Sequence, residues 1–283
     1  MRKIFPKTIH KLMKKDKRIF CLLGDIGVFS FRDVFKRFKS RILNMSTMEQ
    51  TMIGFSAGLS KAGFIPVVHS ITPFLVLRAL EQIKIDLVYN KLSCNIVSVG
   101  ASNDYSKLGT THHCFEDIST LSNYNDINLF LPSNPQELQY LLQKNYNNKE
   151  INYFRISENV NRKKVTKNCY LKLNKHKKLV IIVGNAISER SLINKKNDIY
   201  YINSLTKNMN FNFIKRYKKI IIIEPYFGNI LERKIRKKNI LNKRILTIGY
   251  NETIIHKYGD KRNQDTFLKF NEKNILKKIN EFN

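Results

Sequence analysis

Short apolar runs alternate with segments of helical pattern through the first 155 or so residues of this 283-residue chain. The apolar runs are residues 19–23, 65–69, 95–99, 128–131 and 152–155. Patterns typical of helices lie between them, near residues 31–39, 48–62, 74–90, 116–123 and 135–145. Strands joined by helices in this order form a parallel sheet with helices on its faces. The alternation therefore predicts an α/β fold for this part of the chain.

A second, smaller alternation follows in the C-terminal part. Strands are expected at residues 179–183, 199–202, 220–223 and 245–248, with helices near 228–237 and 272–280. Residues 220–223 are four consecutive isoleucines, a composition suited to burial on both faces of a sheet. The polar, lysine-rich residues 158–178 are interpreted as a linker. We therefore predict two domains, residues 1–157 and 179–283, and a hydrophobic content of 42% is enough for two cores.

The high positive charge of the chain suggests a nucleic-acid-binding protein as one class to consider. Its formal net charge is +29, from 51 lysines and arginines against 22 acidic residues. The lysines are spread over nearly the whole chain, and no helix-turn-helix, zinc-finger or RNP-like motif accompanies them. We therefore expect no specific nucleic-acid partner, and a basic surface that favours phosphorylated substrates or acidic partners.

Apolar runs and cysteines indicate the cellular compartment. No run approaches the roughly 18 apolar residues of a membrane span, and the N-terminus lacks the apolar segment of a secretory signal. The four cysteines, Cys21, Cys94, Cys114 and Cys169, show no CxxC spacing, which favours reduced thiols over disulfides or a zinc site. We expect a soluble, cytoplasmic protein without membrane association.

Two motifs carry chemistry. Residues 44–54, Asn-Met-Ser-Thr-Met-Glu-Gln-Thr-Met-Ile-Gly, place Glu49 on an apolar helix with small residues, where the backbone can pack closely. A buried lone carboxylate is costly unless something binds it, and from this helix alone an exposed glutamate is the simpler interpretation. Residues 109–113, Gly-Thr-Thr-His-His, form a glycine turn with adjacent histidines, which make poor zinc ligands without a nearby carboxylate cluster.

These motifs, together with the opening Met1-Arg2-Lys3 and the turn Gly24-Asp25-Ile26-Gly27, resemble the C-terminal half of transketolase. Many bacteria and archaea make this half as a separate subunit, and the match from the first residue leads us to expect a complete subunit. The resemblance implies a parallel-sheet domain that binds the pyrimidine of thiamine diphosphate, followed by a smaller α/β C-terminal domain. In the second domain it is carried by Val183-Gly184-Asn185, Glu224 and Tyr258-Gly259.

The resemblance also implies roles for individual residues. Glu49 would hydrogen-bond the aminopyrimidine and activate the cofactor. Phe74 falls on a position that stacks on the pyrimidine, with Ile71 and Leu77 at two further positions that are aromatic in the family. Phe74 as an ordinary core residue stays an open alternative. Arg78, on the same segment, is expected to serve packing or subunit contact.

Substrate contacts follow from the same resemblance. His112 directly follows the threonine and would hydrogen-bond the sugar oxygens, with His113 behind it or at an interface. Arg155 matches an arginine that holds the substrate phosphate, and a surface arginine is the equal alternative. Leu108 stands where many transketolases carry an acid, and Gly100 where a histidine or arginine is frequent, so the preferred ketose stays open.

The diphosphate and Mg²⁺ of the cofactor require a Gly-Asp-Gly turn with a downstream asparagine, and the family carries these in its other half. We therefore expect this chain to work only with an N-terminal transketolase subunit, in an α2β2 assembly acting on sugar phosphates. The predicted reaction is transfer of a two-carbon ketol unit from a ketose phosphate to an aldose phosphate. The alternatives are the β subunit of a thiamine-dependent 2-oxoacid dehydrogenase, a deoxyxylulose-phosphate synthase-like activity, and a non-catalytic derivative of the fold. The histidine turn followed by Glu116-Asp117 favours transketolase over the dehydrogenase.

Overall fold

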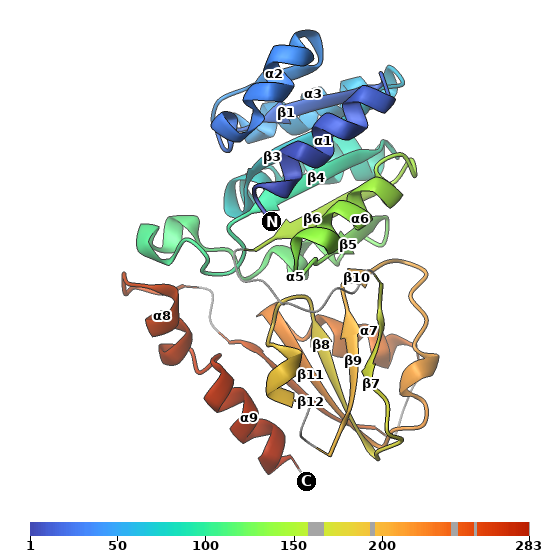
Figure 1. The fold of residues 1–283 in the computed structure, drawn as a ribbon, viewed down its shortest axis with the longest axis vertical. Helices are drawn as coiled ribbons and strands as arrows, with labels where there is room; N and C mark the ends of the chain where they lie inside the picture. The colour runs from blue at the N-terminus through green and yellow to red at the C-terminus, as the bar shows by residue number, and fades with distance from the viewer. Residues whose placement is uncertain (158–166, 193–195, 239–242, 252–253, 283) are drawn as a thin grey trace.

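The computed structural model describes residues 1–157, 167–192, 196–238, 243–251 and 254–282. Each half of the chain contains one sheet, and Figure 1 shows the N-terminal half above the C-terminal half. Within these described ranges, no helix is long and apolar enough to cross a membrane. Of the four cysteines, Cys21, Cys94 and Cys114 are buried thiols and Cys169 is half-buried.

The first sheet has seven strands in the order β10-β5-β6-β4-β3-β1-β2. Its strands are β1 (Ile19–Leu23), β2 (Ile42–Asn44), β3 (Ile65–Ile71), β4 (Cys94–Val99), β5 (Ile127–Phe130), β6 (Ile151–Ile156) and β10 (Ser204–Leu205). The first six strands pair in parallel, which confirms the predicted α/β sheet. The seventh, β10, comes from the C-terminal half and pairs antiparallel with β5. One sheet therefore contains residues from both predicted domains.

Helices cover both faces of this sheet. They are α1 (Ile4–Lys15), η1 (Val28–Phe31), α2 (Arg32–Arg37), η2 (Lys39–Arg41), α3 (Glu49–Lys61), η3 (Pro73–Arg78), α4 (Leu80–Gln82), η4 (Ile83–Tyr89), α5 (Asp117–Leu121) and α6 (Pro135–Asn145). Alternation along β1 decides which face each helix covers. Leu22 packs with Met52 of α3, whereas Leu23 packs with Phe5 of α1 and Leu138 of α6.

The helix predicted over residues 74–90 differs in form from the prediction. Two π-helical segments, η3 and η4, flank a single turn of α-helix, α4. The backbone leaves helical geometry at Ala79, with φ −102° and ψ 20°. π-helical turns are rare in proteins but often occur at functional sites, and η3 carries both Phe74 and Arg78.

The second sheet has five strands in the order β12-β11-β8-β9-β7. Its strands are β7 (Cys169–Lys172), β8 (Lys178–Val183), β9 (Asp198–Ile202), β11 (Lys219–Phe227) and β12 (Arg244–Tyr250). β7 was not expected, because residues 169–172 fall in the predicted linker; that part of the prediction is wrong, since these residues pair antiparallel with β9. Residues 158–166 of the predicted linker lie outside the described residues. The division into two domains stays a prediction.

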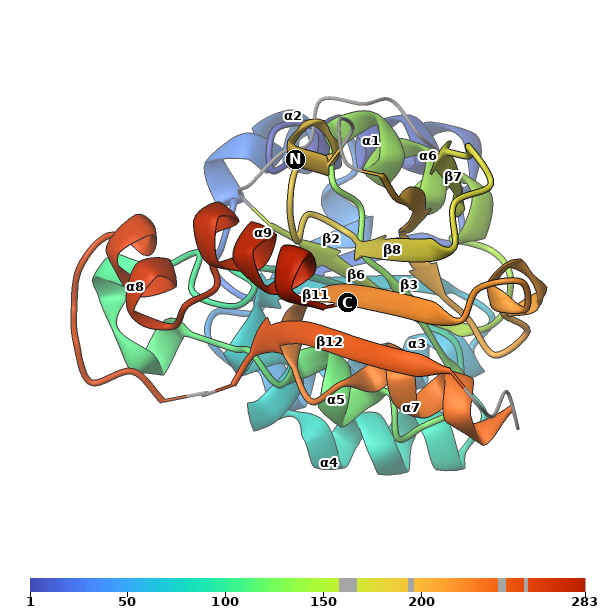
Figure 2. The ribbon, with the colours of Figure 1, turned by 90° about the horizontal axis from the view of Figure 1, so that it is seen from below.

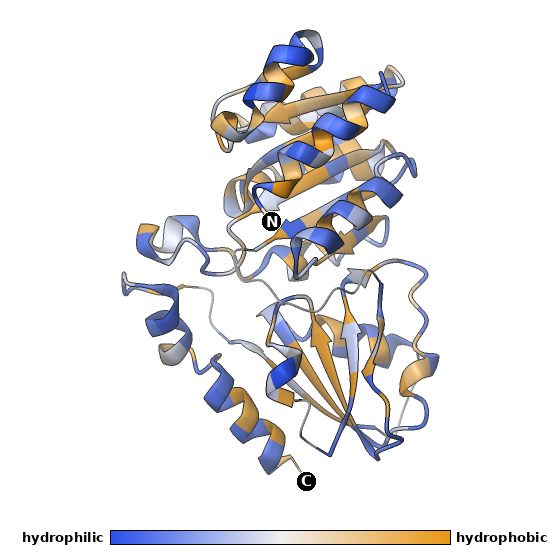
Figure 3. Ribbon diagram, in the orientation of Figure 1, coloured by the Kyte–Doolittle hydropathy of each residue, from blue (hydrophilic) through white to orange (hydrophobic). Residues whose placement is uncertain are grey.

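The isoleucine run lies on β11, an interior strand of the second sheet. Ile220 and Ile222 belong to a core that includes α7 (Ile230–Lys237) and parts of the first half, whereas Ile221 and Ile223 pack with α9 (Glu272–Glu281). Successive residues thus face opposite sides, as strand geometry requires. Figure 3 shows the strands of this sheet as largely hydrophobic, and Figure 2 shows α7 and α9 on opposite sides of it. The shorter elements here are η7 (Glu189–Leu192), η8 (Asn212–Ile214) and α8 (Lys261–Phe267).

Glu224 of β11 connects this sheet to α7. Its carboxylate accepts hydrogen bonds from the backbone N–H groups of Ile230 at 3.0 Å and Leu231 at 2.7 Å. Burial nevertheless raises the pKa of Glu224 from 4.5 to about 7. The folded state therefore binds this proton more tightly than the unfolded chain does, so stability is lost as pH rises from about 4.5 through about 7.

We expect Glu224→Gln to remove this pH dependence. The unfolding free energy of the wild-type chain should fall by about 3 kcal/mol more than that of the variant when the pH is raised from about 5 to about 8. Urea unfolding at the two pH values measures this difference. Glu272→Gln, at an exposed position on α9, is the control and should follow the wild type. An equal pH dependence in wild type and Glu224→Gln would contradict the prediction.

Candidate functional site

The predicted site segments meet at one edge of the first sheet. β2, β1, β3 and β4 are parallel neighbours, so their carboxyl ends lie at the same edge. Glu49 follows β2, Gly24 follows β1, residues 72–78 follow β3, and the turn with His112 follows β4. Open parallel sheets bind ligands outside the carboxyl ends of their strands. This edge is the candidate site.

Glu49 is the first residue of α3 and is fully buried. One carboxylate oxygen accepts a hydrogen bond from Ser70 Oγ at 2.6 Å, and the other accepts one from Arg78 Nη1 at 2.6 Å. The start of a helix also favours negative charge. Glu49 is thus neither exposed nor without hydrogen-bond partners. A carboxylate can accept about four hydrogen bonds, so Glu49 can still accept one from a further donor.

Gly24 allows Ser70 and Glu49 to approach each other. A Cβ at position 24 would lie 2.7 Å from Ser70 Oγ, 2.8 Å from Ser70 Cβ and 3.2 Å from Glu49 Oε1. The Gly24 N–H donates to the carbonyl of His69 at 2.8 Å, so the backbone here is tied to β3. Ser70 is itself a residue of β3 and cannot move away without disturbing the sheet.

Gly24→Ala should therefore displace Ser70 and Glu49. We expect a loss of about 1–3 kcal/mol in unfolding free energy, as in other overpacked sites. Gly58→Ala is the matched control, since apart from its own helix backbone and chain neighbours nothing lies within 4 Å of a Cβ there, and it should be neutral or slightly stabilising. Unfolding curves of both variants test this; equal stability of Gly24→Ala and wild type would contradict it.

Phe74 lies between two polar partners. The guanidinium carbon of Arg78 is 4.3 Å from the centre of the Phe74 ring, within cation–π range. The ring of His112 meets Phe74 edge to face, with ring centres 5.1 Å apart. Contacts therefore run without interruption from Glu49 through Arg78 and Phe74 to His112. These residues come from three separate segments of the chain.

Ile71 and Leu77 border this group. Ile71 is the last residue of β3, and both side chains are half-buried. Leu77 packs against the hydrophobic core beneath α3. Their predicted contact with a pyrimidine ring stays a prediction.

The two histidines of the turn have different surroundings. η5 (Ser106–Leu108) and η6 (Thr110–His112) flank Gly109, whose φ of +79° suits glycine. His112 is half-buried, and its Nδ1 lies 3.0 Å from Thr111 Oγ1. His113 is only 4% exposed and contacts Phe115. Burial lowers the pKa of both imidazoles, so His112 is mostly neutral at pH 7.

The C-terminal half holds this turn in place. Thr110 Oγ1 donates to the carbonyl of Ile255 at 2.7 Å, and the Gln264 side chain donates to the carbonyl of Ser106 at 3.3 Å. The ring of Tyr258 lies so close to Gly109 that a Cβ there would be 2.5 Å away. The position of His112 thus depends on residues more than a hundred positions later in the chain.

The two departures from the sugar-binding pattern have structural explanations. The Tyr105 ring packs on Gly100, where a Cβ would lie only 2.3 Å from it, and the φ of Gly100 is +80°. A histidine or arginine cannot fit there without moving Tyr105. Leu108 is 51% exposed beside the histidine turn, so an apolar side chain takes the place of the acid.

Arg155 lies within the contact between the two halves. Its side chain is 2% exposed and pairs with Asp117 at 2.7 Å. It also donates to Ser102 Oγ at 2.8 Å and to the carbonyl of Pro225 at 3.1 Å. Burial by itself would lower the pKa of the guanidinium, but Asp117 outweighs it and the pKa is raised. The alternative of a surface arginine is wrong, and the substrate-phosphate role stays a prediction that this burial does not favour.

Ser70, Arg78 and Gly24 were not singled out from the sequence as site residues. Arg78 was expected to serve packing or subunit contact, but it pairs with Glu49. Its position four residues after Phe74 is a signal that could have indicated a shared face. Gly24 belongs to the turn quoted for the resemblance, but neither it nor Ser70 indicated a contact with Glu49, because that contact depends on the register between β1 and β3.

The sequence matches the family model described as "Transketolase, pyrimidine binding domain" over residues 1–163. This match covers more than half of the chain. The chain belongs to this family. The resemblance predicted from the Glu49 and His112 motifs is thereby confirmed.

Two curated relatives match about half of this chain. An uncharacterized 33.6 kDa protein in the fasciation locus of Rhodococcoides fascians is 34% identical over 158 residues, which cover 56% of this chain and 51% of that protein. A subunit of the apulose-4-phosphate transketolase of Phocaeicola vulgatus is 32% identical over 143 residues, which cover 50% of this chain and 46% of that protein. The matched region thus spans about half the length of these relatives.

One solved structure extends the likeness to the C-terminal half. It is described as a split gene transketolase in an inactive beta4 tetramer and superposes with a TM-score of 0.85. The alignment covers 99% of this chain and 97% of that chain at 18% sequence identity. At this identity the comparison establishes the fold, including that of the second sheet, and the predicted fold class is confirmed.

Proposed function

We propose that this chain is the C-terminal-type subunit of a thiamine diphosphate-dependent transketolase. The reaction would transfer a two-carbon ketol unit from a ketose phosphate to an aldose phosphate. The observation that carries this proposal is the continuous set of contacts from Glu49 through Arg78 and Phe74 to His112. It joins Glu49 and Phe74, the predicted cofactor residues, to His112, a predicted sugar residue, at one sheet edge.

The residues at this edge fit the pyrimidine end of the cofactor. Glu49 is a buried acceptor with capacity for an N–H donor, and Phe74, Ile71 and Leu77 are half-buried apolar side chains nearby in sequence and fold. Since Glu49 is fully buried and the Arg78 side chain is 41% exposed, we infer that the aminopyrimidine reaches the carboxylate by displacing Arg78. When bound, thiamine diphosphate supplies a carbon nucleophile for the ketol unit.

His112 would act on the sugar. A neutral imidazole can donate one hydrogen bond and accept another, which suits hydroxyl and carbonyl oxygens that exchange protons during the transfer. Its contact with Phe74 places it beside the proposed pyrimidine wall. The Thr110–Ile255 hydrogen bond keeps the turn at that distance.

The diphosphate and Mg²⁺ would be held by an N-terminal-type partner subunit. Among the described residues, no group of three or more His, Cys, Asp or Glu side chains is placed to hold a metal ion. We place the metal in the partner and propose an α2β2 assembly. The solved relative described as an inactive beta4 tetramer is compatible with this arrangement.

Ketol transfer from xylulose 5-phosphate to ribose 5-phosphate tests the proposal. The full chain is assayed alone and with its candidate N-terminal partner, in the presence of thiamine diphosphate and Mg²⁺. Activity only in the pair is expected. Apulose 4-phosphate is a second donor to assay, since one relative carries that name. Decarboxylation of a 2-oxoacid by the pair would favour the dehydrogenase alternative, and a stable but inactive pair with all donors would favour a non-catalytic subunit.

A further inference from the structure

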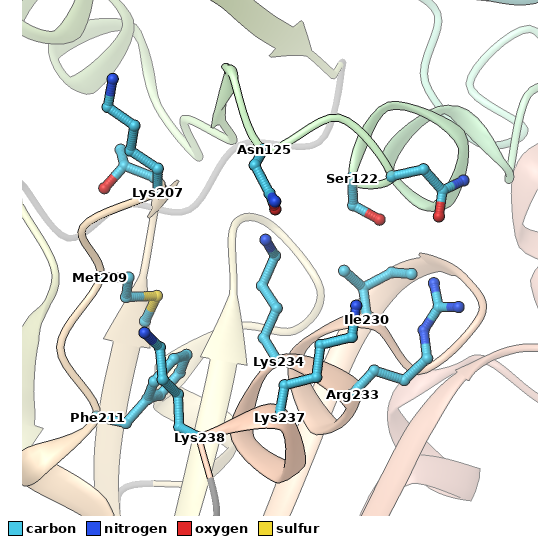
Figure 4. Close-up of a pocket in the computed structure, with 12 residues that line it drawn as sticks. Ser122, Asn125, Lys207, Met209, Phe211, Ile230, Arg233, Lys234, Lys237 and Lys238 are labelled. Atoms are coloured by element: carbon cyan, nitrogen blue, oxygen red, sulfur yellow. The ribbon is translucent and has the colours of Figure 1, made fainter.

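A cleft between the two halves lies away from the candidate site. Its volume is about 380 Å³, within the range of small-molecule sites. Residues after α5 form one wall, the segment after β10 forms another, and α7 forms the third. The lining residues are Ser122, Asn123, Asn125, Thr206, Lys207, Met209, Phe211, Ile230, Arg233, Lys234, Lys237 and Lys238. Figure 4 shows Lys234 and Lys237 extending from α7 toward Asn125 and Ser122.

The four cations that α7 and its C-terminal end bring to this cleft lack counterions. Among the described residues, Arg233, Lys234, Lys237 and Lys238 form no ion pair, and none of the lining residues is acidic. Lys207, by contrast, pairs with Glu150 at 2.6 Å. On the same helix, Arg236 does not line the cleft and pairs with Glu232 at 2.8 Å. The unpaired charges of α7 are thus the ones that face the cleft.

Keeping four positive charges together is unfavourable. Arg233 and Lys237 are four residues apart, as are Lys234 and Lys238, and like charges at this spacing destabilise a helix. Lys234 is half-buried. Its burial is the larger cause of a lowered pKa of its ammonium group, and repulsion from Lys237 and Arg233 lowers the pKa further. A bound anion would offset both effects. Half-burial alone does not distinguish Lys234, since Lys219 and Lys278 are also half-buried; its distinguishing feature is its place in a cleft with three further cations that form no ion pair among the described residues.

Two further features narrow the range of ligands that fit this cleft. Ser122, Asn123 and Asn125 face the cations and supply hydroxyl and amide groups for hydrogen bonds. Met209 adds a half-buried apolar side chain to the cleft, whereas Phe211 and Ile230 are only 6% and 1% exposed. Four cations match the charge of a diphosphate or triphosphate. We propose that this cleft binds a nucleoside diphosphate or triphosphate, with its phosphates held by the cations of α7 and Lys238 and its base against Met209.

Calorimetric titration of the full chain tests this proposal with three probes: ADP, inorganic pyrophosphate and adenosine, at one ionic strength. ADP should bind most tightly, pyrophosphate more weakly and adenosine not measurably. The double variant Lys234→Gln/Lys237→Gln should weaken ADP binding at least about tenfold. The matched control, Lys11→Gln/Lys14→Gln, removes two exposed charges with the same spacing on α1 and should leave binding unchanged.

Thermal unfolding without ligand distinguishes a lost site from a lost fold. The Lys234→Gln/Lys237→Gln variant should unfold at the same temperature as the wild type or a higher one, because it removes like-charge repulsion. Three outcomes would overturn the proposal. These are no measurable ADP binding by the wild type, equal weakening by both double variants, or pyrophosphate binding as tight as that of ADP.

Discussion

Glu49→Gln is expected to reduce ketol transfer by the assembled enzyme about 10³-fold. Glutamine keeps the size of the side chain and can still accept from Ser70. It cannot carry the negative charge that pairs with Arg78 and that would hold the aminopyrimidine. Initial rates with saturating cofactor and substrates measure the effect, and cofactor affinity should fall with them.

Glu81→Gln is the control for this prediction. Glu81 is an exposed glutamate on α4, three residues after Arg78, and no described contact links it to the site. Its removal should leave the rate within about twofold of wild type, as expected for a surface substitution. Size-exclusion chromatography must show that both variants assemble equally with the partner. A Glu49→Gln rate above about a tenth of wild type would contradict the proposed role.

Local patterns predicted the elements of this fold well where each strand or helix carries its own signal. The isoleucines of β11 alternate between two cores, which the run itself indicates. α6 begins at Pro135, as predicted, because Asn134 accepts from the Glu137 N–H and proline suits the first helical position. β2, β7 and β10 escaped prediction because none of them contains a run of four apolar residues, so that pairing with a neighbouring strand rather than composition defines them.

The candidate site divides in the same way. Glu49, Phe74 and His112 were identified through motifs, each local in the sequence, and the fold brings them together. Arg78 and Ser70 acquire their roles only through contacts with Glu49, and those contacts depend on tertiary structure. Arg155 shows most clearly that a resemblance in sequence does not predict the surroundings of a side chain. Its place at the end of β6 was predicted, but its burial depends on Asp117 and on the C-terminal half.

Asp117→Asn is expected to destabilise the fold by about 3–5 kcal/mol, because it leaves the Arg155 guanidinium buried without its countercharge. Asp117 also accepts from Tyr153 Oη at 2.7 Å, so the substitution disturbs a connected polar group. Urea unfolding measures the loss. Glu281→Gln, which removes an exposed pair with Lys277 at 3.8 Å, is the control and should change stability by less than about 0.5 kcal/mol.

The double variant Asp117→Asn/Arg155→Met separates a structural role of Arg155 from a substrate role. Removing both charges should recover much of the lost stability, because no unpaired charge stays buried. If Arg155 only joins the two halves, the recovered double variant should show an unchanged KM for sugar phosphates. If Arg155 holds the substrate phosphate, KM should rise at least about tenfold in a double variant of restored stability. No recovery of stability would contradict the pairing itself, since the cost of Asp117→Asn would then not come from the charge of Arg155.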